Sequence, residues 1–246
     1  MRPVIGITSD FEVDATNDPP RALLVSPIDY SDAILAAGGL PQLLPLPAQP
    51  DDALLDALLA RVDGLLFTGG RDLHPRNYGE PLHPKTRPLH ERRDAFDLAL
   101  FRRADAAHTP ILAICLGFQV AHVARGGKLI QHVDDLGLKP PVVHRLPRGP
   151  GAFHTVRITP DSRLAAIVGA TEIRVNSRHH QAPDADHPGD RLLPVGLAPD
   201  GILEASEDMA GRFLLGVQWH PENLIDRPEH LALFRALVSE AAQRPA

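Results

Sequence analysis

Apolar and polar residues alternate in blocks along the first half of the chain. Short, almost wholly apolar runs are typical of buried strands, and they occupy residues 4–8, 42–46, 64–67 and 111–114. Between them lie predicted helices at residues 29–37, 51–61, 92–107 and 117–125. Strands and helices that alternate in this way are typical of a parallel sheet covered by helices on both faces.

The second half of the chain is richer in strands. We predict strands at residues 155–158, 172–175, 192–197, 202–205 and 214–219, and a last helix at residues 227–242. No segment is long enough to serve as a linker between two domains. We therefore expect residues 1–246 to form a single α/β domain. Its central, mostly parallel sheet would be flanked by helices and extended by antiparallel strands.

Local signals predict the ends of the first helix. Ser26 followed by Pro27 favours a helix start, because serine caps helices and proline suits the first turn. Gly38 and Gly39 favour its end, because glycine allows a positive φ.

Residues 71–91 form a long predicted loop that contains Pro75, Pro81, Pro84 and Pro88. The loop is too long for a mere connector, and its prolines would keep it stiff. We expect it to serve as a lid or as a wall of a substrate site.

The charge balance changes this picture little, but it excludes some functions. The chain has 25 lysines and arginines against 31 aspartates and glutamates, a net charge of −6. This balance disfavours nonspecific binding of nucleic acid. The most apolar stretch, residues 111–123, is too short to span a bilayer, and the amino-terminal apolar run is too short for a signal sequence. We expect a cytoplasmic protein with neither nucleic acid nor membrane as partner.

The single cysteine, Cys115, carries the first chemical signal. Alone it cannot form an intrachain disulfide, a paired-cysteine zinc site or an iron–sulfur site. It lies where an apolar strand turns directly into a helix, with the small residues Ala113 and Gly117 on either side. That arrangement resembles a nucleophile elbow, in which the helix start favours a thiolate and the N–H of Leu116 can hold an oxyanion. A buried apolar cysteine is the alternative, and the turn alone leaves both interpretations open.

A partner base follows about a hundred residues later, in Gly216-Val217-Gln218-Trp219-His220-Pro221-Glu222. In an extended chain His220 and Glu222 project to the same side, and Pro221 stiffens the link. A carboxylate beside an imidazole orients it and stabilises its protonated form, as a Cys–His–acid triad requires. His-Pro-Glu is a weak signal by itself, but together with the cysteine elbow it becomes strong.

Motifs along nearly the whole chain resemble those of class I glutamine amidotransferase-like hydrolases, and more closely the γ-glutamyl-γ-aminobutyrate hydrolase family. They are, in order, VIGIT, AILAAGGLPQLLP, DGLLFTGGRDLHPRNYGE, RRDAFDLALFRRA, ICLGFQ, GGKLIQHV, VNSRHHQAP, DGILEA and GVQWHPE. The resemblance implies a flavodoxin-like sheet. It also implies that Cys115 is the nucleophile, His220 the general base and Glu222 its orienting acid.

The resemblance further assigns residues around the triad. The Gly69-Gly70 turn, with Leu116, would donate N–H groups to the oxyanion. The family match also places Arg93 and Asp94 near the site. Contacts to the γ-glutamyl group are implied for Gln119, Ser177, His179, His180 and Gln181.

Two residues depart from the family pattern. Leu116 stands where the hydrolases often have arginine and resembles the ammonia-producing amidotransferases. Ala113 stands where those amidotransferases usually have glycine. Neither departure removes a catalytic group, but because of the first the identity of the amine that is released stays open.

The histidines do not predict a metal. His179, His180 and the loop residues His74, His83 and His90 lack an HExxH spacing, so we interpret them as scattered surface histidines. No glycine pattern resembles a dinucleotide or phosphate loop. We therefore expect no metal and no cofactor.

These patterns predict a hydrolase that cleaves the γ-glutamyl amide bond of a small-molecule γ-glutamyl substrate through a thioester. Two alternatives stay open: a glutaminase subunit that feeds ammonia to a synthetase, and a non-catalytic thiol sensor on the same fold. A homodimer is one of the oligomeric states left open.

Overall fold

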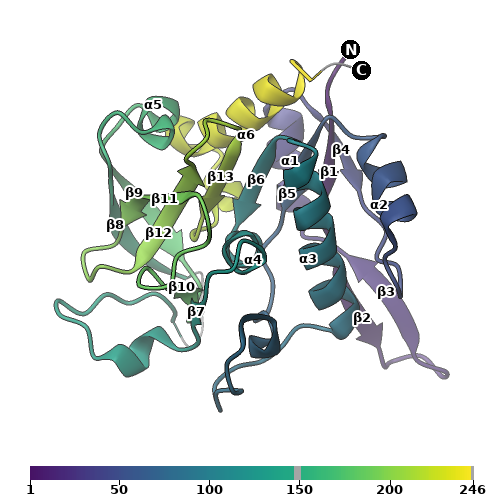
Figure 1. Ribbon diagram of the computed structural model, residues 1–246, viewed down its shortest axis with the longest axis horizontal. Helices are drawn as coiled ribbons and strands as arrows, with labels where there is room; N and C mark the ends of the chain where they lie inside the picture. The colour runs from purple at the N-terminus through teal and green to yellow at the C-terminus, as the bar shows by residue number, and fades with distance from the viewer. Residues whose placement is uncertain (147–150, 245–246) are drawn as a thin grey trace.

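The computed structural model describes residues 1–146 and 151–244 and is built around one nine-stranded sheet (Figure 1). The strand order is β4-β1-β5-β6-β13-β12-β11-β8-β9. In chain order these strands are β1 (Val4–Ile7), β4 (Leu40–Leu43), β5 (Gly64–Phe67), β6 (Ile111–Ile114), β8 (Ala152–Ile158), β9 (Glu172–Ser177), β11 (Leu192–Leu197), β12 (Leu203–Asp208) and β13 (Leu214–Val217). The sheet thus joins strands from both halves of the chain. The predicted single domain also includes residues 147–150 and 245–246, which lie outside the described residues.

The sheet is parallel on one side and antiparallel on the other. From β4 through β1, β5 and β6 to β13 all pairings are parallel. From β13 through β12, β11 and β8 to β9 all pairings are antiparallel. The prediction of a central parallel sheet with an antiparallel extension is confirmed. Strand β13 is the junction, because it pairs with β6 in parallel and with β12 in antiparallel fashion.

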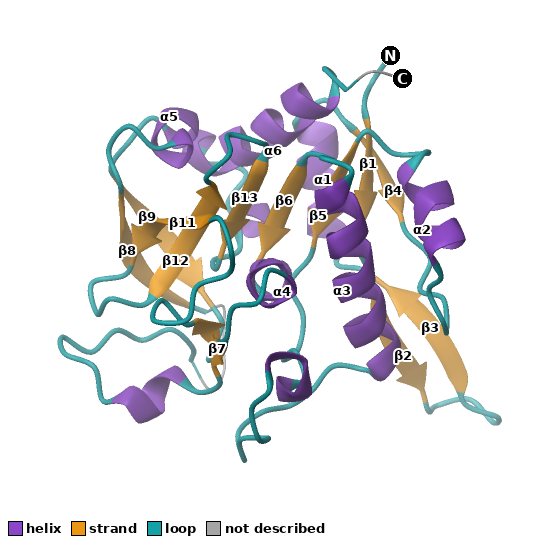
Figure 2. Cartoon of the chain, in the orientation of Figure 1, coloured by secondary structure: helices purple, strands orange, loops and turns teal. Residues whose placement is uncertain are grey.

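Helices cover both faces of the sheet (Figure 2). They are α1 (Ile28–Ala36), α2 (Asp52–Leu59), α3 (Glu91–Ala106), α4 (Leu116–Ala124), α5 (Arg163–Val168) and α6 (Pro228–Ala241). Apolar residues of α1, α5 and α6 pack in one core, and those of α2, α3 and α4 pack in a second. In β6, Leu112 and Ile114 enter the first core while Ile111 and Ala113 enter the second. This explains why the strand is wholly apolar, since successive side chains face opposite, equally buried layers.

Several elements differ from the predictions. A hairpin of β2 (Asp10–Asp14) and β3 (Arg21–Val25) stands outside the main sheet, at the lower right of Figure 1. Its strand β2 has no apolar run, and the apolar residues 22–25 of β3 are exposed or half-buried and not part of the core. Helix α5 was also missed, because it is short. It is capped by Ser162, whose Oγ accepts from Ala165 N at 3.0 Å.

The predicted Ser26 cap is wrong. Helix α1 begins at Ile28 with Pro27 in the cap position, which offers no side-chain acceptor.

Short elements complete the fold. They are β7 (Leu129–Ile130), β10 (Ala182–Pro183) and the 3₁₀ turns Pro75–Tyr78, Val133–Leu136 and Pro221–Asn223. Within the described ranges, the chain contains no helix of the length and apolar character needed to cross a membrane.

Candidate active site

Three neighbouring parallel strands end at the same edge of the sheet and carry the predicted triad and glycine turn. Phe67 of β5 lies opposite Ala113 of β6, and Ile114 of β6 lies opposite Val217 of β13. Because their carboxyl ends coincide, the residues that follow the three strands are brought together. This edge is where open α/β sheets bind ligands.

Cys115 occupies a strained turn between β6 and α4. Its φ of 52° and ψ of −104° lie outside the regions that non-glycine residues favour. Its N–H donates to Val217 O at 2.8 Å, which ties the turn to β13. The residue is only 6% exposed. The geometry is that of the elbow predicted from the sequence, and such strain persists only where the surroundings enforce it.

Glycine allows the helix after the elbow to lie close to the sheet. A Cβ at Gly117 would stand 2.5 Å from Phe67 O, and one at Gly216 would stand 2.2 Å from Phe118 Cδ2. Any larger residue would therefore push α4 away from β5 or β13, and Cys115 with it.

His220 and Glu222 form a buried pair just beyond β13. His220 Nδ1 lies 2.7 Å from Glu222 Oε1, and the two residues are 8% and 3% exposed. The link between them is a 3₁₀ turn, Pro221–Asn223, and not the extended chain that we predicted. The turn brings the carboxylate to the imidazole, so the pairing holds although its predicted backbone geometry is wrong.

Asn176, at the end of β9, fixes the backbone of His220. Its Nδ2 donates to His220 O at 2.9 Å, and its Oδ1 accepts from His220 N at 2.9 Å. Sequence reasoning missed this role. The only signal was its position directly before the segment from Ser177 to Gln181, to which we had assigned substrate contacts.

The charges around His220 favour its protonated form. Burial alone would lower the pKa of the imidazole, but the Glu222 carboxylate and the Cys115 thiol raise it to about 10. At neutral pH the ring is therefore an imidazolium, the form that can donate a proton to a leaving group.

The Gly69-Gly70 turn after β5 is held by buried groups. Gly69 N donates to the Tyr30 hydroxyl at 2.9 Å. Arg93, 1% exposed, donates through Nη2 to Gly69 O at 3.0 Å and to Thr68 Oγ1 at 2.9 Å. A Cβ at Gly70 would stand 2.5 Å from Arg93 Nη1. Since the Gly69 N–H is engaged, the amides of Gly70 and of Leu116, the latter in the first turn of α4, are the better placed for an oxyanion.

Two adjoining cavities meet at the elbow and share Gly70 and Arg178. The smaller, of about 150 Å³, is lined by Cys115 together with four arginines: Arg71, Arg87, Arg145 and Arg178. The larger, of about 300 Å³, is lined by His220 together with four carboxylates: Asp10, Glu12, Asp29 and Glu222. The two sides of the site thus differ in charge.

Of the five residues with predicted γ-glutamyl contacts, four line the smaller cavity: Gln119, His179, His180 and Gln181. Ser177 does not line either of these two cavities. Its Oγ donates to His144 O at 2.7 Å, and the side chain is fully buried.

The interpretation of His179 and His180 as surface histidines is wrong, because they are only 4% and 8% exposed. The order of the strands buries them, and the sequence pattern carries no signal for that.

The long segment at 71–91 lies against the smaller cavity, to which it contributes Arg71, Asp72 and Arg87. Asp94 anchors it from α3, because its carboxylate accepts from His74 N at 3.1 Å and from Asn77 Nδ2 at 2.9 Å. The position fits the predicted substrate wall.

Fold and site together define a hydrolase of the glutamine amidotransferase-like class. The chain belongs to the Peptidase C26 family, whose model matches residues 3–222.

Named relatives agree with this assignment, and one solved structure shares the fold. The chain is 39% identical to "Putative glutamine amidotransferase Rv2859c" of Mycobacterium tuberculosis, over 98% of this chain and 75% of the relative. It is 34% identical to γ-glutamyl-γ-aminobutyrate hydrolase PuuD of Escherichia coli, over 78% of this chain and 76% of the relative. The glutaminase domain of Trypanosoma brucei CTPS superposes with a TM-score of 0.64 at 16% identity, covering 99% of this chain and 95% of that one. This last likeness concerns the fold alone.

Proposed function

We propose that this protein hydrolyses the amide bond of small γ-glutamyl amines, such as γ-glutamyl-γ-aminobutyrate, to glutamate and the free amine. The observation that carries the proposal is the strained Cys115 elbow beside a His220 imidazole that Glu222 holds at 2.7 Å. The relatives named as γ-glutamyl-γ-aminobutyrate hydrolases, at 34–35% identity, support the substrate class.

In the first half of the reaction Cys115 Sγ attacks the γ-carbonyl carbon and forms the C–S bond. The amides of Gly70 and Leu116 stabilise the oxyanion of the tetrahedral intermediate. The intermediate collapses as His220 gives its proton to the amide nitrogen, so the C–N bond breaks and the amine leaves.

In the second half water hydrolyses the thioester. The neutral His220 takes a proton from the water, whose oxygen attacks the same carbon. Collapse of the second intermediate breaks the C–S bond and releases glutamate. The thiolate then lies again beside an imidazolium, and Glu222 stabilises that charge throughout. The steps require no cofactor, and this chain supplies every catalytic group.

The charges of the two cavities suggest how the substrate lies. Arginines match a carboxylate well, so we place the α-carboxylate of the glutamyl group in the smaller cavity. The leaving amine then extends past His220 into the larger, acidic cavity. This orientation puts the scissile bond between Cys115 and the proton donor.

A substrate panel measured on the purified chain alone tests the proposal. We expect turnover of γ-glutamyl amides with release of glutamate, and loss of that turnover in Cys115→Ala with binding retained. Full amidase activity in Cys115→Ala would refute the scheme.

The same panel separates the two alternatives. Turnover of glutamine that appears only after a synthetase partner is added would indicate a glutaminase subunit, which Leu116 favours. A glutamine-like electrophile that leaves no adduct on Cys115 would indicate a thiol sensor. Size-exclusion chromatography with light scattering tests the homodimer.

A further inference from the structure

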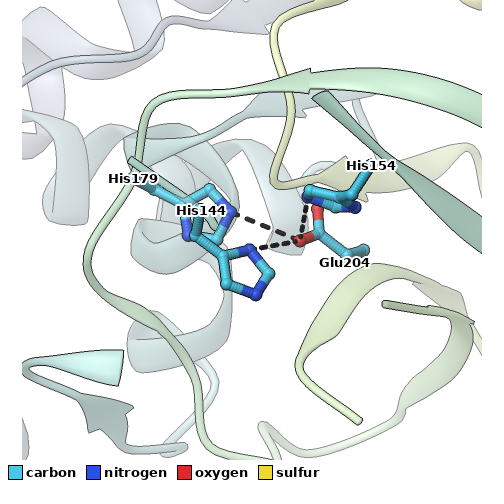
Figure 3. Close-up of side chains that lie close together, drawn as sticks. All are labelled: His144, His154, His179 and Glu204. Atoms are coloured by element: carbon cyan, nitrogen blue, oxygen red, sulfur yellow. Dashed lines mark ion pairs between the residues drawn. The ribbon is translucent and has the colours of Figure 1, made fainter. Parts of the chain in front are cut away.

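Three histidines and one glutamate form a cluster on the antiparallel half of the sheet and the segments next to it (Figure 3). His154 is on β8, Glu204 is on β12, His179 follows β9, and His144 precedes β8. All four side chains are at most 5% exposed. The catalytic steps proposed above use none of them.

Five buried atoms of this cluster have no hydrogen-bond partner among the described residues. They are His144 Nδ1, His154 Nε2, His179 Nε2 and the two carboxylate oxygens of Glu204. Buried polar atoms normally have hydrogen-bond partners. Here one such atom from each of the four side chains lies within 4.8 Å of the others, so their grouping requires an explanation.

Each ring has an inner nitrogen, which faces Glu204, and an outer nitrogen, which faces away from it. The contacts of the outer nitrogens indicate whether the inner nitrogens bear a hydrogen. Each outer nitrogen lies near an oxygen acceptor: His144 Nε2 at 2.9 Å from Asp200 Oδ2, His154 Nδ1 at 3.0 Å from Thr155 O, and His179 Nδ1 at 2.9 Å from Gln181 O. An outer N–H that donates to such an acceptor leaves a lone pair on the inner nitrogen of a neutral ring. With all three rings neutral, three lone pairs face a carboxylate, and a positive charge, from a metal ion or from protons on the rings, is needed to remove the repulsion.

The distances fit a metal ion. The inner nitrogens of His144, His154 and His179 lie 3.4, 3.4 and 3.3 Å from Glu204 Oε1. In a tetrahedral zinc site with bonds of about 2.0–2.1 Å, neighbouring ligand atoms are about 3.4 Å apart. All four ligand atoms lie within 4.8 Å of one another, so modest side-chain shifts would close the remaining gaps.

The surroundings also match those of known zinc sites. Histidine ligands of zinc usually donate their second N–H to a carboxylate or a backbone carbonyl, as all three rings do here. Glu204 and Asp200, whose side chains are 0% and 2% exposed, together balance the charge of a divalent cation.

We propose that His144, His154, His179 and Glu204 bind a divalent transition-metal ion, with zinc as the best match. Imidazole and carboxylate ligands suit zinc, and four protein ligands make a closed site, which is typical of a structural ion. The ion ties the segment before β8 and the segment after β9 to strands β8 and β12. Because His179 also lines the smaller cavity, the ion stabilises one wall of the substrate site.

Metal content provides the first test. The full chain is expressed in zinc-supplemented minimal medium, desalted and measured by elemental mass spectrometry. We expect about one zinc per chain in the wild type, as for a four-ligand structural site, and a loss of most of it in Glu204→Gln and His154→Gln. The matched control is His187→Gln, which changes an exposed histidine outside the cluster and should keep its zinc.

Two measurements on the wild type keep the proposal falsifiable if the variants fail to fold. Chain expressed with Co²⁺ in place of zinc should show the visible absorption of a tetrahedral cobalt site. Its Tm should fall with a strong chelator and recover with added Zn²⁺. A folded wild type that shows no cobalt band, and whose Tm changes with neither zinc nor chelator, would overturn the proposal. The four side chains would then be held together by hydrogen bonds from protonated histidines to Glu204.

Discussion

Replacing the Glu222 carboxylate by an amide should move the alkaline limit of activity by several pH units. In the wild type the pKa of His220 is about 10 against an ordinary value of 6.5, despite burial that alone would lower it. The imidazolium that protonates the leaving amine is therefore present below pH 10 and is lost as the pH rises through that value. In Glu222→Gln burial remains while the opposing carboxylate is gone. The contribution of Cys115 also remains, so the pKa should fall from about 10 toward the ordinary value of 6.5.

The expected magnitude follows from the fraction of protonated ring. At pH 8 a ring with a pKa of 6.5 is protonated in about 3% of molecules, so lost protonation should lower kcat/KM by up to about 30-fold. Lost orientation of the ring would add to this. The assay is kcat/KM for a γ-glutamyl amide from pH 5 to pH 11, with Glu172→Gln, an exposed carboxylate on β9, as the control.

The same substitution should change the pH dependence of stability. A folded-state pKa raised from 6.5 to about 10 contributes stability that is fully present below pH 6.5 and is lost as the pH rises through 10. The Tm of the wild type should therefore decline between these values, and that decline should be weaker in Glu222→Gln. If the variant keeps its alkaline limit near pH 10, or loses less than about threefold at pH 8, Glu222 does not stabilise the imidazolium and the reasoning fails.

Three further substitutions probe the rest of the site. Asn176→Ala leaves the buried N–H and C=O of His220 without their 2.9 Å partners. It should lower the free energy of unfolding by about 2–4 kcal/mol in urea titrations, and an unchanged midpoint would contradict this. Gly70→Ala would place a Cβ 2.5 Å from Arg93 Nη1; the displaced amide should lower kcat about 100-fold with little change in KM, whereas a pure KM effect would argue against an oxyanion role. Glu12→Gln removes an exposed carboxylate from the larger cavity. It should raise kcat/KM for leaving amines that carry a carboxylate by about twofold to fivefold at low salt and less at high salt, and equal effects on uncharged amines would exclude a charge mechanism.

The fold was predictable where burial imposes a pattern on the sequence. Strands β5 and β6 are apolar throughout because both of their faces are covered, so they were visible as short apolar runs. The hairpin of β2 and β3 was not visible, because it pairs outside the main sheet and most of its residues are exposed or half-buried. Its strands are held by backbone hydrogen bonds to each other and by contacts of β2 with α3, such as the ion pair of Asp10 and Arg93 at 3.1 Å. Such contacts leave little trace in hydrophobic patterning.

The candidate site divides in the same way. The elbow at Cys115 and the His220–Glu222 pair come from short local segments, so the sequence identified these residues, although the 3₁₀ turn that joins His220 to Glu222 was not predicted. Asn176, which lies 44 positions before His220, comes from a different strand and has no local signal.

The sequence by itself determined the alternation of strands and helices, the family, and the three residues of the proposed triad, because each depends on short-range spacing or on recognisable motifs. Only the tertiary structure decided which polar residues share a buried space. The cluster around Glu204 draws its four side chains from separate segments of the chain and becomes a site only because β8, β9, β11 and β12 pair side by side. Hydrophobic patterning indicates which residues are buried. Which residues lie next to a buried charge depends on the order of the strands in the sheet, and no short segment of sequence determines that order.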